Sequence, residues 1–279
     1  MKDLDGFTVA VVGLGLMGGS LAMALKQNGV GRRIVGDDVS PQTVARALEM
    51  GAIDEACGDI ATTDLIVLAM PVRAIIAWCD EHRWQVRPDQ IVMDLGSTKR
   101  DVVSQMEAMP AQCVGGHPMC GKEQSGLLAA DPALFRSAKF VLVPTARARG
   151  ETMDTLKQLI LRIGAQSVVM DAETHDRAVA AISHLPYLLS ASLVNTIGDL
   201  RDDHARALAS SGYASMTRLA ASDPQMMADI IATNGANIVA MIDRYQQELW
   251  RWRAAIADGT PAEWRARLEQ ARGRVEGQP

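Results

Sequence analysis

Cysteine, aromatic residues and positive charge are all scarce in this chain. The four cysteines among 279 residues (Cys57, Cys79, Cys113 and Cys120) form no CxxC pair, which argues against a zinc or disulfide framework. We therefore expect reduced thiols, a cytoplasmic location and no bound metal. The net charge of −5 argues against a general nucleic-acid binder or an anionic-membrane binder, so neither partner is expected.

Long apolar runs and targeting signals are also missing from the sequence. No apolar run reaches the roughly 18–20 residues of a membrane span. The N-terminal residues MKDLDGFTVAVVGLG enter an apolar segment at once and lack a signal-peptide pattern. The chain has no internal repeat. Since 48% of the residues are hydrophobic, the chain can bury a sizeable core, and its length suits two domains.

Short apolar, β-branched segments alternate with helical patterns through the first half. This alternation predicts an α/β fold with a Rossmann-type, doubly wound and mostly parallel sheet that has helices on both faces. Helices are expected at 20–29 and 41–51, the second with Pro41 in its first turn. The expected strands are 7–13, 32–38, 64–70, 90–96, 139–144 and 167–171.

The second half has an all-helical pattern. We expect a dinucleotide-binding domain over residues 1–171 and a helical substrate-binding and dimerisation domain over 172–279. An apolar stripe along one long predicted helix is either core or part of a dimer interface, and a homodimer through these helices is the expected assembly. The stripe consists of Ile230, Ile231, Ile238, Met241, Ile242, Tyr245, Leu249 and Trp252.

The segment GLGLMGGS follows the first predicted strand and begins a helix. Its spacing is Gly13-x-Gly15-x-x-Gly18, with Leu16 and Met17 inside the pattern. In this context GxGxxG indicates a pyrophosphate site, where the first glycine permits a tight turn, the second lets the backbone approach the phosphates and the third allows close packing. A plain strand–helix turn is the alternative. The segment predicts a bound dinucleotide cofactor.

An acidic pair ends the second predicted strand, about where the ribose of a dinucleotide is held. Asp38 is expected to accept hydrogen bonds from the ribose hydroxyls, with Asp37 as the alternative. A carboxylate there repels a 2′-phosphate, and the next residues, VSPQ (39–42), contain no arginine, so we expect NAD rather than NADP. Ala69, Met70 and Pro71, at the end of the predicted strand 64–70, are expected beside the nicotinamide.

Residues 115–126, GGHPMCGKEQSG, have a composition that suits neither a helix nor a strand. We therefore expect a loop that has a functional role. Three further segments are DLGSTK (94–99), HDRAVAAISHLP (175–186) and SSGYASMTRLAASDP (210–224). With the glycine-rich turn, these segments resemble the motifs of the prephenate dehydrogenase family, which includes arogenate and cyclohexadienyl dehydrogenases. The resemblance spans residues 7–235.

The resemblance implies an oxidative decarboxylation. Hydride passes from the ring carbon that bears the 4-hydroxyl to NAD, carbon dioxide leaves the opposite ring carbon, and the ring becomes aromatic. His117 matches the family's catalytic histidine, and a neutral imidazole is suited to accept the hydroxyl proton. Ser97 matches the serine that hydrogen-bonds the same hydroxyl and the histidine. The alternatives are a surface histidine for His117 and helix N-capping for Ser97.

The resemblance also implies four substrate-binding residues. Arg218 matches an arginine that holds a substrate carboxylate, since a guanidinium binds a carboxylate bidentately; a surface ion pair is the alternative. His184 matches a histidine that lines the substrate pocket, or it is a buried structural histidine. Glu123 matches a glutamate at the mouth of the site. Lys99 is expected to pair with a carboxylate near the site, or it lies on the surface.

Other residues of these motifs leave alternatives open. Asp176, which follows His175, either orients a site residue or favours a helix N-terminus. Cys120 is either a small loop filler or a reactive thiol. Some relatives have a lysine just before the arginine of the TR motif, where this chain has Ala214 and Ser215. The choice between prephenate and arogenate therefore stays open, and an amino-substituted prephenate is also conceivable.

Two rival functions fit a two-domain dinucleotide-binding protein. A β-hydroxyacid dehydrogenase needs a helix lysine as acid or base in its second half, and the sequence has no lysine after Lys157. A non-catalytic dinucleotide sensor would not need Ser97, His117, His184 and Arg218 together. The sequence therefore predicts an NAD-dependent prephenate or cyclohexadienyl dehydrogenase of tyrosine biosynthesis, acting on a small dicarboxylate.

Overall fold

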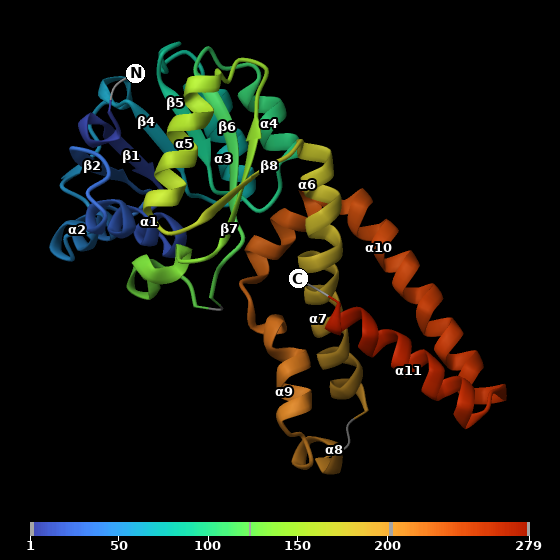
Figure 1. Cartoon of the computed structure of the whole chain (residues 1–279). Helices are drawn as coiled ribbons and strands as arrows, with labels where there is room; N and C mark the ends of the chain where they lie inside the picture. The colour runs from blue at the N-terminus through green and yellow to red at the C-terminus, as the bar shows by residue number, and fades with distance from the viewer. Residues whose placement is uncertain (1–2, 123, 201–202, 278–279) are drawn as a thin grey trace.

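A computed structural model describes residues 3–122, 124–200 and 203–277. Its first half contains one eight-stranded sheet, with the order β3-β2-β1-β4-β5-β6-β7-β8 (Figure 1). The mostly parallel, Rossmann-type sheet predicted from the sequence is confirmed. The strands are β1 (Thr8–Val12), β2 (Arg33–Asp37), β3 (Glu55–Ala56), β4 (Leu65–Leu68), β5 (Ile91–Asp94), β6 (Gln112–Pro118), β7 (Lys139–Pro144) and β8 (Gln166–Val169).

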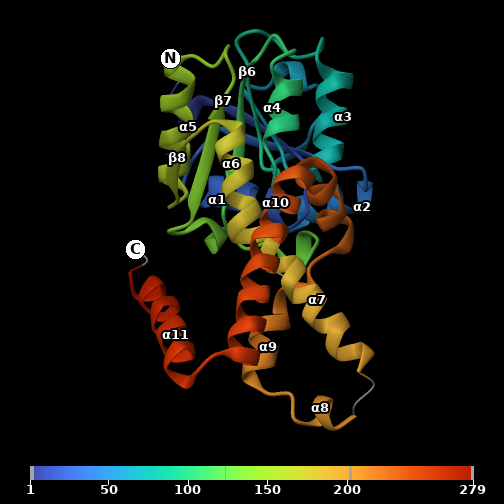
Figure 2. The same ribbon diagram turned by 90° about the vertical axis from the view of Figure 1, so that its right-hand side faces the viewer.

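Helices cover both faces of the sheet. They are α1 (Leu16–Gln27), α2 (Pro41–Glu49), α3 (Val72–His82), α4 (Arg100–Met106) and α5 (Gly150–Arg162). Figure 2 shows α5 on one side of the strands and α3 and α4 on the other. Short 3-10 helices lie at Leu4–Gly6, Ile60–Thr62, Leu127–Ala129 and Pro132–Phe135.

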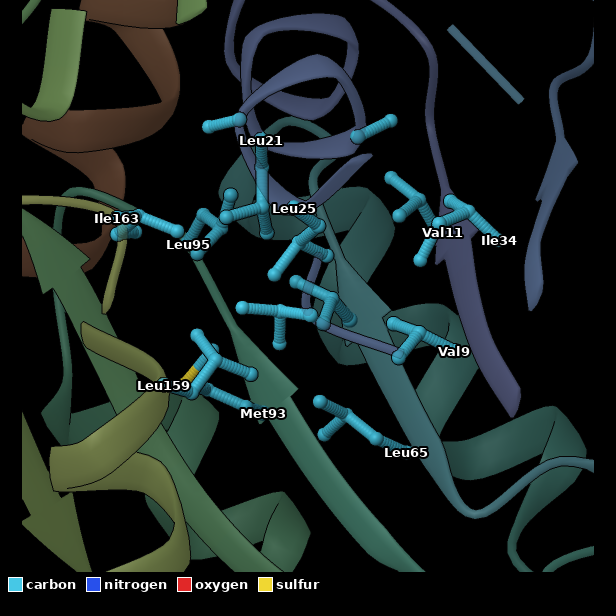
Figure 3. Close-up of a cluster of buried hydrophobic side chains, with 14 of the residues drawn as sticks. Val9, Val11, Leu21, Leu25, Ile34, Leu65, Met93, Leu95, Leu159 and Ile163 are labelled. Atoms are coloured by element: carbon cyan, nitrogen blue, oxygen red, sulfur yellow. The ribbon is translucent and has the colours of Figure 1, made fainter. Parts of the chain in front are cut away.

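The continuous apolar strands are explained by two separate cores. Val9 and Val11 of β1 pack with Leu21 and Leu25 of α1 in one cluster, which Figure 3 shows. Ala10 of β1 faces the other way, into a second cluster with residues of α3 and α4. Since successive strand residues point to opposite faces, a strand that is buried on both faces has to be apolar at every position.

Strand β7 is the one antiparallel neighbour among the described strands, because it pairs with β6 in the opposite direction. The pairing includes the start of the segment that was expected to be a loop. Gly115, Gly116, His117 and Pro118 are paired with Val143, Leu142, Val141 and Phe140, respectively. That expectation was therefore wrong for residues 115–118, which extend β6.

The chain after β8 is helical. It comprises α6 (Ala172–Val179), a π-helical turn (Ala180–His184), α7 (Leu185–Asp199), α8 (Asp203–Ala207), α9 (Ser211–Thr217), a 3-10 turn (Arg218–Ala221), α10 (Pro224–Asp258) and α11 (Pro261–Glu276). Helix α6 packs on α4 and helix α10 packs on α3, so the helical half meets the face of the sheet that these helices cover. Figure 1 shows α7, α9 and α11 extending away from the sheet.

The apolar stripe of α10 is divided between core and surface. Ile230 and Ile238 are buried with Ala180 and Met227. Farther along, Leu249 is 51% exposed, and Ile242 and Tyr245 are exposed as well.

The helical run Ala172–Asp199 is long and apolar enough to span a membrane, judged by length and composition alone, and 28% of its most apolar window is buried. This corrects the expectation that no run reaches that length, although a core helix passes the same test.

Candidate active site

The glycine-rich turn lies between β1 and α1. Gly13 has a φ of +91°, a backbone conformation that favours glycine, and its N–H donates to the carbonyl of Asp37 at 2.8 Å. A Cβ on Gly18 would lie 1.8 Å from the carbonyl oxygen of Gly13, so only glycine fits where α1 meets the turn. A Cβ on Gly15 would meet nothing within 4 Å, which leaves room at the helix N-terminus for a ligand.

The other expected cofactor residues lie around this turn. The Asp38 carboxylate accepts hydrogen bonds from the N–H groups of Leu14, at 2.8 Å, and Ser40, at 2.9 Å. A carboxylate has about four lone-pair sites, so Asp38 can still accept from a ligand. Ala69 and Met70 pack against the turn, with atoms within 3 Å of a Cβ placed on Gly13. Pro71 is the N-cap residue of α3.

His117 lies near the end of β6, where the backbone is closely packed. A Cβ on Gly116 would lie 2.3 Å from the carbonyl oxygen of Asp94 on the neighbouring strand. The N–H of Gly116 donates to the Asp94 carboxylate at 3.0 Å. Glycine is therefore needed here for close approach between strands, and this packing places His117 at the C-terminal edge of the sheet, where such folds bind ligands.

The protonated form of His117 is strongly disfavoured. Burial lowers the pKa of His117 well below its usual value of 6.5, and His175, Lys99 and His184 lower it further. The imidazole is consequently neutral at neutral pH, the form in which it can accept a proton.

A cleft of about 550 Å³ brings the predicted residues together between the two halves of the chain. Ser97, His117, His184 and Arg218 line this cleft. Leu16 and Met17, from the start of α1, line it as well. Lys122 and Tyr187, which were not predicted as site residues, also line the cleft. The available signal was their place in the chain, since Lys122 lies inside the 115–126 motif and Tyr187 directly follows the 175–186 motif.

Ser97 follows β5 and is partly exposed in the cleft. The alternative of helix capping is wrong, because α4 begins at Arg100 with Lys99 as its N-cap residue and without a side-chain capping bond. Its neighbour Thr98 shares a 2.8 Å hydrogen bond with Thr233 of α10, which ties the Ser97 segment to the helical half. The Nδ1 atom of His117 bonds to His175 rather than to Ser97.

His184 lies in the π-helical turn and is 1% exposed. The Asn234 side-chain amide donates to the carbonyl of Asp176 at 2.8 Å and lies 3.2 Å from Nδ1 of His184. Because a carbonyl can only accept, the Asn234 nitrogen is a donor, so Nδ1 of His184 accepts and Nε2 carries the proton. Burial is the main cause that lowers the pKa of His184 to about 4, so the ring is neutral at neutral pH.

Lys99 lies under the site rather than at the cleft wall. Its side chain is 0% exposed, and its ammonium group forms an ion pair with the equally buried Asp94. The same carboxylate accepts from the N–H of Gly96 at 2.7 Å. Lys99 is therefore not placed to bind the substrate, as had been expected. Its partner is the internal carboxylate of Asp94 on β5, which also bonds the backbone of β6.

Three further motif residues are Glu123, Cys120 and Asp176. Glu123 lies outside the described residues. Cys120 lines the cleft, and burial raises the pKa of its thiol to about 11, which favours the loop filler over the reactive thiol. Asp176 is 1% exposed and accepts hydrogen bonds from the N–H groups of Lys99 and Arg100.

Two family descriptions match the chain. Residues 21–169 match "Prephenate dehydrogenase, nucleotide-binding domain", and residues 171–270 match "Prephenate dehydrogenase, dimerization domain". Among curated proteins, the chain is similar to the prephenate dehydrogenase of Bacillus subtilis (strain 168). The two are 33% identical over 266 residues, which cover 92% of this chain and 71% of the relative.

Two solved structures have closely similar folds. One is prephenate dehydrogenase from A. aeolicus in complex with hydroxyphenyl propionate and NAD+, with a TM-score of 0.89, 29% identity, and coverage of 98% of this chain and all of the other. The other is Synechocystis arogenate dehydrogenase, with a TM-score of 0.84, 29% identity, and coverage of 96% and 99% of the two chains.

Proposed function

The chain belongs to the prephenate dehydrogenase family, and on this basis we propose that it catalyses the NAD-dependent oxidative decarboxylation of prephenate to 4-hydroxyphenylpyruvate in tyrosine biosynthesis. One observation supports this most strongly. A single cleft joins a neutral histidine, a serine and an arginine to the start of the helix that follows the glycine-rich turn.

The residues around the glycine-rich turn fit NAD. Gly15 would admit the pyrophosphate at the N-terminus of α1, while Gly13 and Gly18 would permit the tight turn and the close packing of α1 that form this site. The Asp38 carboxylate would accept from the ribose hydroxyls. Leu16, Met17, Ala69, Met70 and Pro71 would complete the cofactor site. Bound NAD supplies the hydride acceptor.

The proton chemistry falls to His117. The substrate hydroxyl donates its proton to the neutral imidazole while hydride leaves the same ring carbon. The bond to the ring carboxylate then breaks, carbon dioxide departs, and the bonding electrons enter the ring. The phenol oxygen recovers the proton from His117, so the enzyme ends in its starting state. Ser97, in the same cleft, would hydrogen-bond the hydroxyl and fix its direction.

Two further residues would bind the rest of the substrate. His184 would donate from Nε2, since Asn234 occupies Nδ1. The Arg218 guanidinium would bind a carboxylate. A gating or orienting role for Glu123 at the mouth of the site stays a prediction from the family motif. Lys99 would support the site through Asp94 rather than bind the substrate.

The charges around the cleft favour prephenate over arogenate. Lys122 and Arg218 line the cleft, and both are cations. Lys122 can supply positive charge that is missing at Ala214 and Ser215, although it also pairs with Asp131 at 2.8 Å. Prephenate is a dicarboxylate with a keto group where arogenate has an ammonium, so a cationic pocket suits prephenate better. Arogenate or an amino-substituted prephenate remains the second candidate substrate.

The two halves of the chain have different roles in the proposed enzyme. We infer a nucleotide-binding domain over residues 1–171 and a substrate-binding and dimerisation domain over 172–279. The match to a dimerization domain supports a homodimer, and the exposed apolar side chains of α7, α10 and α11 offer a surface that a second copy could cover. A cytoplasmic location accords with an NAD-dependent biosynthetic enzyme.

A direct test is NADH formation by the purified protein with NAD, with prephenate and arogenate offered in parallel. We expect turnover of prephenate with the higher kcat/KM. In the same assay with NADP, kcat/KM should fall, because Asp38 repels the 2′-phosphate. No turnover of either substrate by protein that still binds NAD would contradict the proposed function.

Replacing Arg218 by alanine should raise the KM for prephenate by about 10- to 100-fold, since a charge-assisted hydrogen bond contributes about 1.5–3 kcal/mol. The kcat should change less, because binding affects ground state and transition state alike. Steady-state kinetics would measure both. Arg177→Ala, an exposed arginine on α6, is the matched control, and an equal KM in the two variants would remove Arg218 as the carboxylate ligand.

A further inference from the structure

A chain of hydrogen bonds lies directly behind the imidazole of His117. Nδ1 of His117 lies 2.8 Å from Nε2 of His175, and Nδ1 of His175 lies 2.7 Å from a carboxylate oxygen of Asp176. The two rings meet edge to face, with 5.0 Å between their centroids. His175 and Asp176 are each 1% exposed, so water does not compete for these bonds.

The carboxylate at the end of the chain is held as an anion. One oxygen of Asp176 accepts from the N–H of Lys99 at 2.7 Å, and the other accepts from the N–H of Arg100 at 2.9 Å. Burial raises the pKa of Asp176, but the bonds from His175, Arg100 and Lys99 outweigh this, so the pKa lies below its usual value. An ionised carboxylate only accepts hydrogen bonds.

This anion determines where each proton lies. Because Asp176 accepts, Nδ1 of His175 has to carry a proton. In a neutral imidazole the other nitrogen is then an acceptor. With His175 in this neutral form, its Nε2 accepts from Nδ1 of His117, which then carries the proton. The lone pair of His117 is consequently on Nε2.

We propose that His175 and Asp176 are positioning residues that hold His117 in the tautomer whose Nε2 accepts the substrate proton. The proposal rests on the proposed function and deepens it. The proton moves from the hydroxyl to Nε2 and later returns to the phenol oxygen. His175 keeps its own proton throughout, and the Asp176 anion stabilises the imidazolium that exists between the two steps.

The surroundings explain why such support is needed. The groups that face His117 are His175 on α6, His184 in the π-helical turn and Lys99 before α4, and the Asp94–Lys99 ion pair lies beneath. Lys99 and burial both oppose a positive charge on the ring. Through His175, Asp176 supplies the anion on the side of the ring where Nδ1 lies.

The kinetic test compares two substitutions at position 175. In His175→Leu the acceptor for Nδ1 of His117 is lost, and kcat should fall by about 100-fold or more, within the range of general-base contributions. The KM for prephenate and the Kd for NAD should stay within about twofold, because neither ligand loses a contact. In His175→Gln the amide oxygen can accept from Nδ1, so most of kcat should return. Arg177→Ala, on the same helix, is the control.

A second measurement determines the tautomer of His117 directly and requires no enzymatic turnover. The chain has five histidines, so long-range ¹H–¹⁵N NMR of ¹⁵N-histidine-labelled protein gives few signals, and His117→Asn assigns those of His117. We expect a protonated Nδ1 and an unprotonated Nε2. An inactive wild-type protein with this tautomer would support the hydrogen-bonded chain and overturn the proposed function. A protonated Nε2, or an unchanged kcat in His175→Leu, would overturn the inference.

Discussion

Replacing His117 by asparagine is expected to lower kcat by about 10²- to 10⁴-fold, the usual contribution of a general base. An asparagine amide cannot accept a proton at neutral pH, whereas the lowered pKa of His117 keeps the imidazole neutral and able to accept one. The Kd for NAD should not change, because the glycine-rich turn and Asp38 are untouched. Steady-state kinetics and NAD titration would measure the two effects.

The matched control is His82→Asn on α3. This histidine bonds the carbonyl of Trp78 at 3.1 Å and stacks on its ring, and it is not among the residues that line the cleft. Its replacement should leave kcat within about twofold. If His117→Asn also kept its turnover, His117 would not be the base, and the proton would have to pass to another group in the cleft.

Replacing Lys99 by methionine is expected to lower the free energy of unfolding by about 3–5 kcal/mol, the effect of removing one partner of a buried ion pair. The Asp94 carboxylate would remain fully buried without its counter-charge. Without Lys99, the two hydrogen bonds that Asp94 accepts from the N–H groups of Gly96 and Gly116 would be left to stabilise its buried negative charge. Urea unfolding followed by circular dichroism would measure the change.

A surface ion pair supplies the comparison. Lys26 bonds Asp54 at 2.6 Å, with about a third of each side chain exposed. Lys26→Met should cost about 0.2–1 kcal/mol, as is typical of exposed pairs. An equal cost in the two variants would show that Lys99 contributes no more than a surface lysine, and its assignment as an internal support would fail.

Much of the fold was accessible from local sequence patterns. The runs at 7–13 and 139–144 predicted strands because a strand buried on both faces needs apolar residues throughout. Residues 115–118 were mistaken for a loop because two glycines and a proline disfavour a strand in isolation. Their place in β6 depends on neighbouring backbone, since the carbonyl of Asp94 leaves no space for a Cβ at Gly116.

The site was predictable in part. Motif residues His117, Ser97, His184 and Arg218 line one cleft, as the family resemblance implied. Lys99 was expected to pair with a carboxylate near the site as a substrate-binding residue, or to lie on the surface, yet its side chain is fully buried and its partner is Asp94. The alternative that Asp176 orients a site residue is favoured by its bond to His175, and no local pattern distinguished it from a helix-end charge.

The sequence by itself determined the features that depend on near neighbours: buried strands, a glycine-rich turn that suits a dinucleotide, and the residue types needed for proton transfer and carboxylate binding. The tertiary structure decided the features that depend on distant pairs. His117 and His175 lie 58 positions apart, and Asp176 and the N–H of Lys99 lie 77 apart. Which nitrogen of His117 accepts a proton follows from those contacts, because hydrogen bonds between buried groups form only when the packed halves meet.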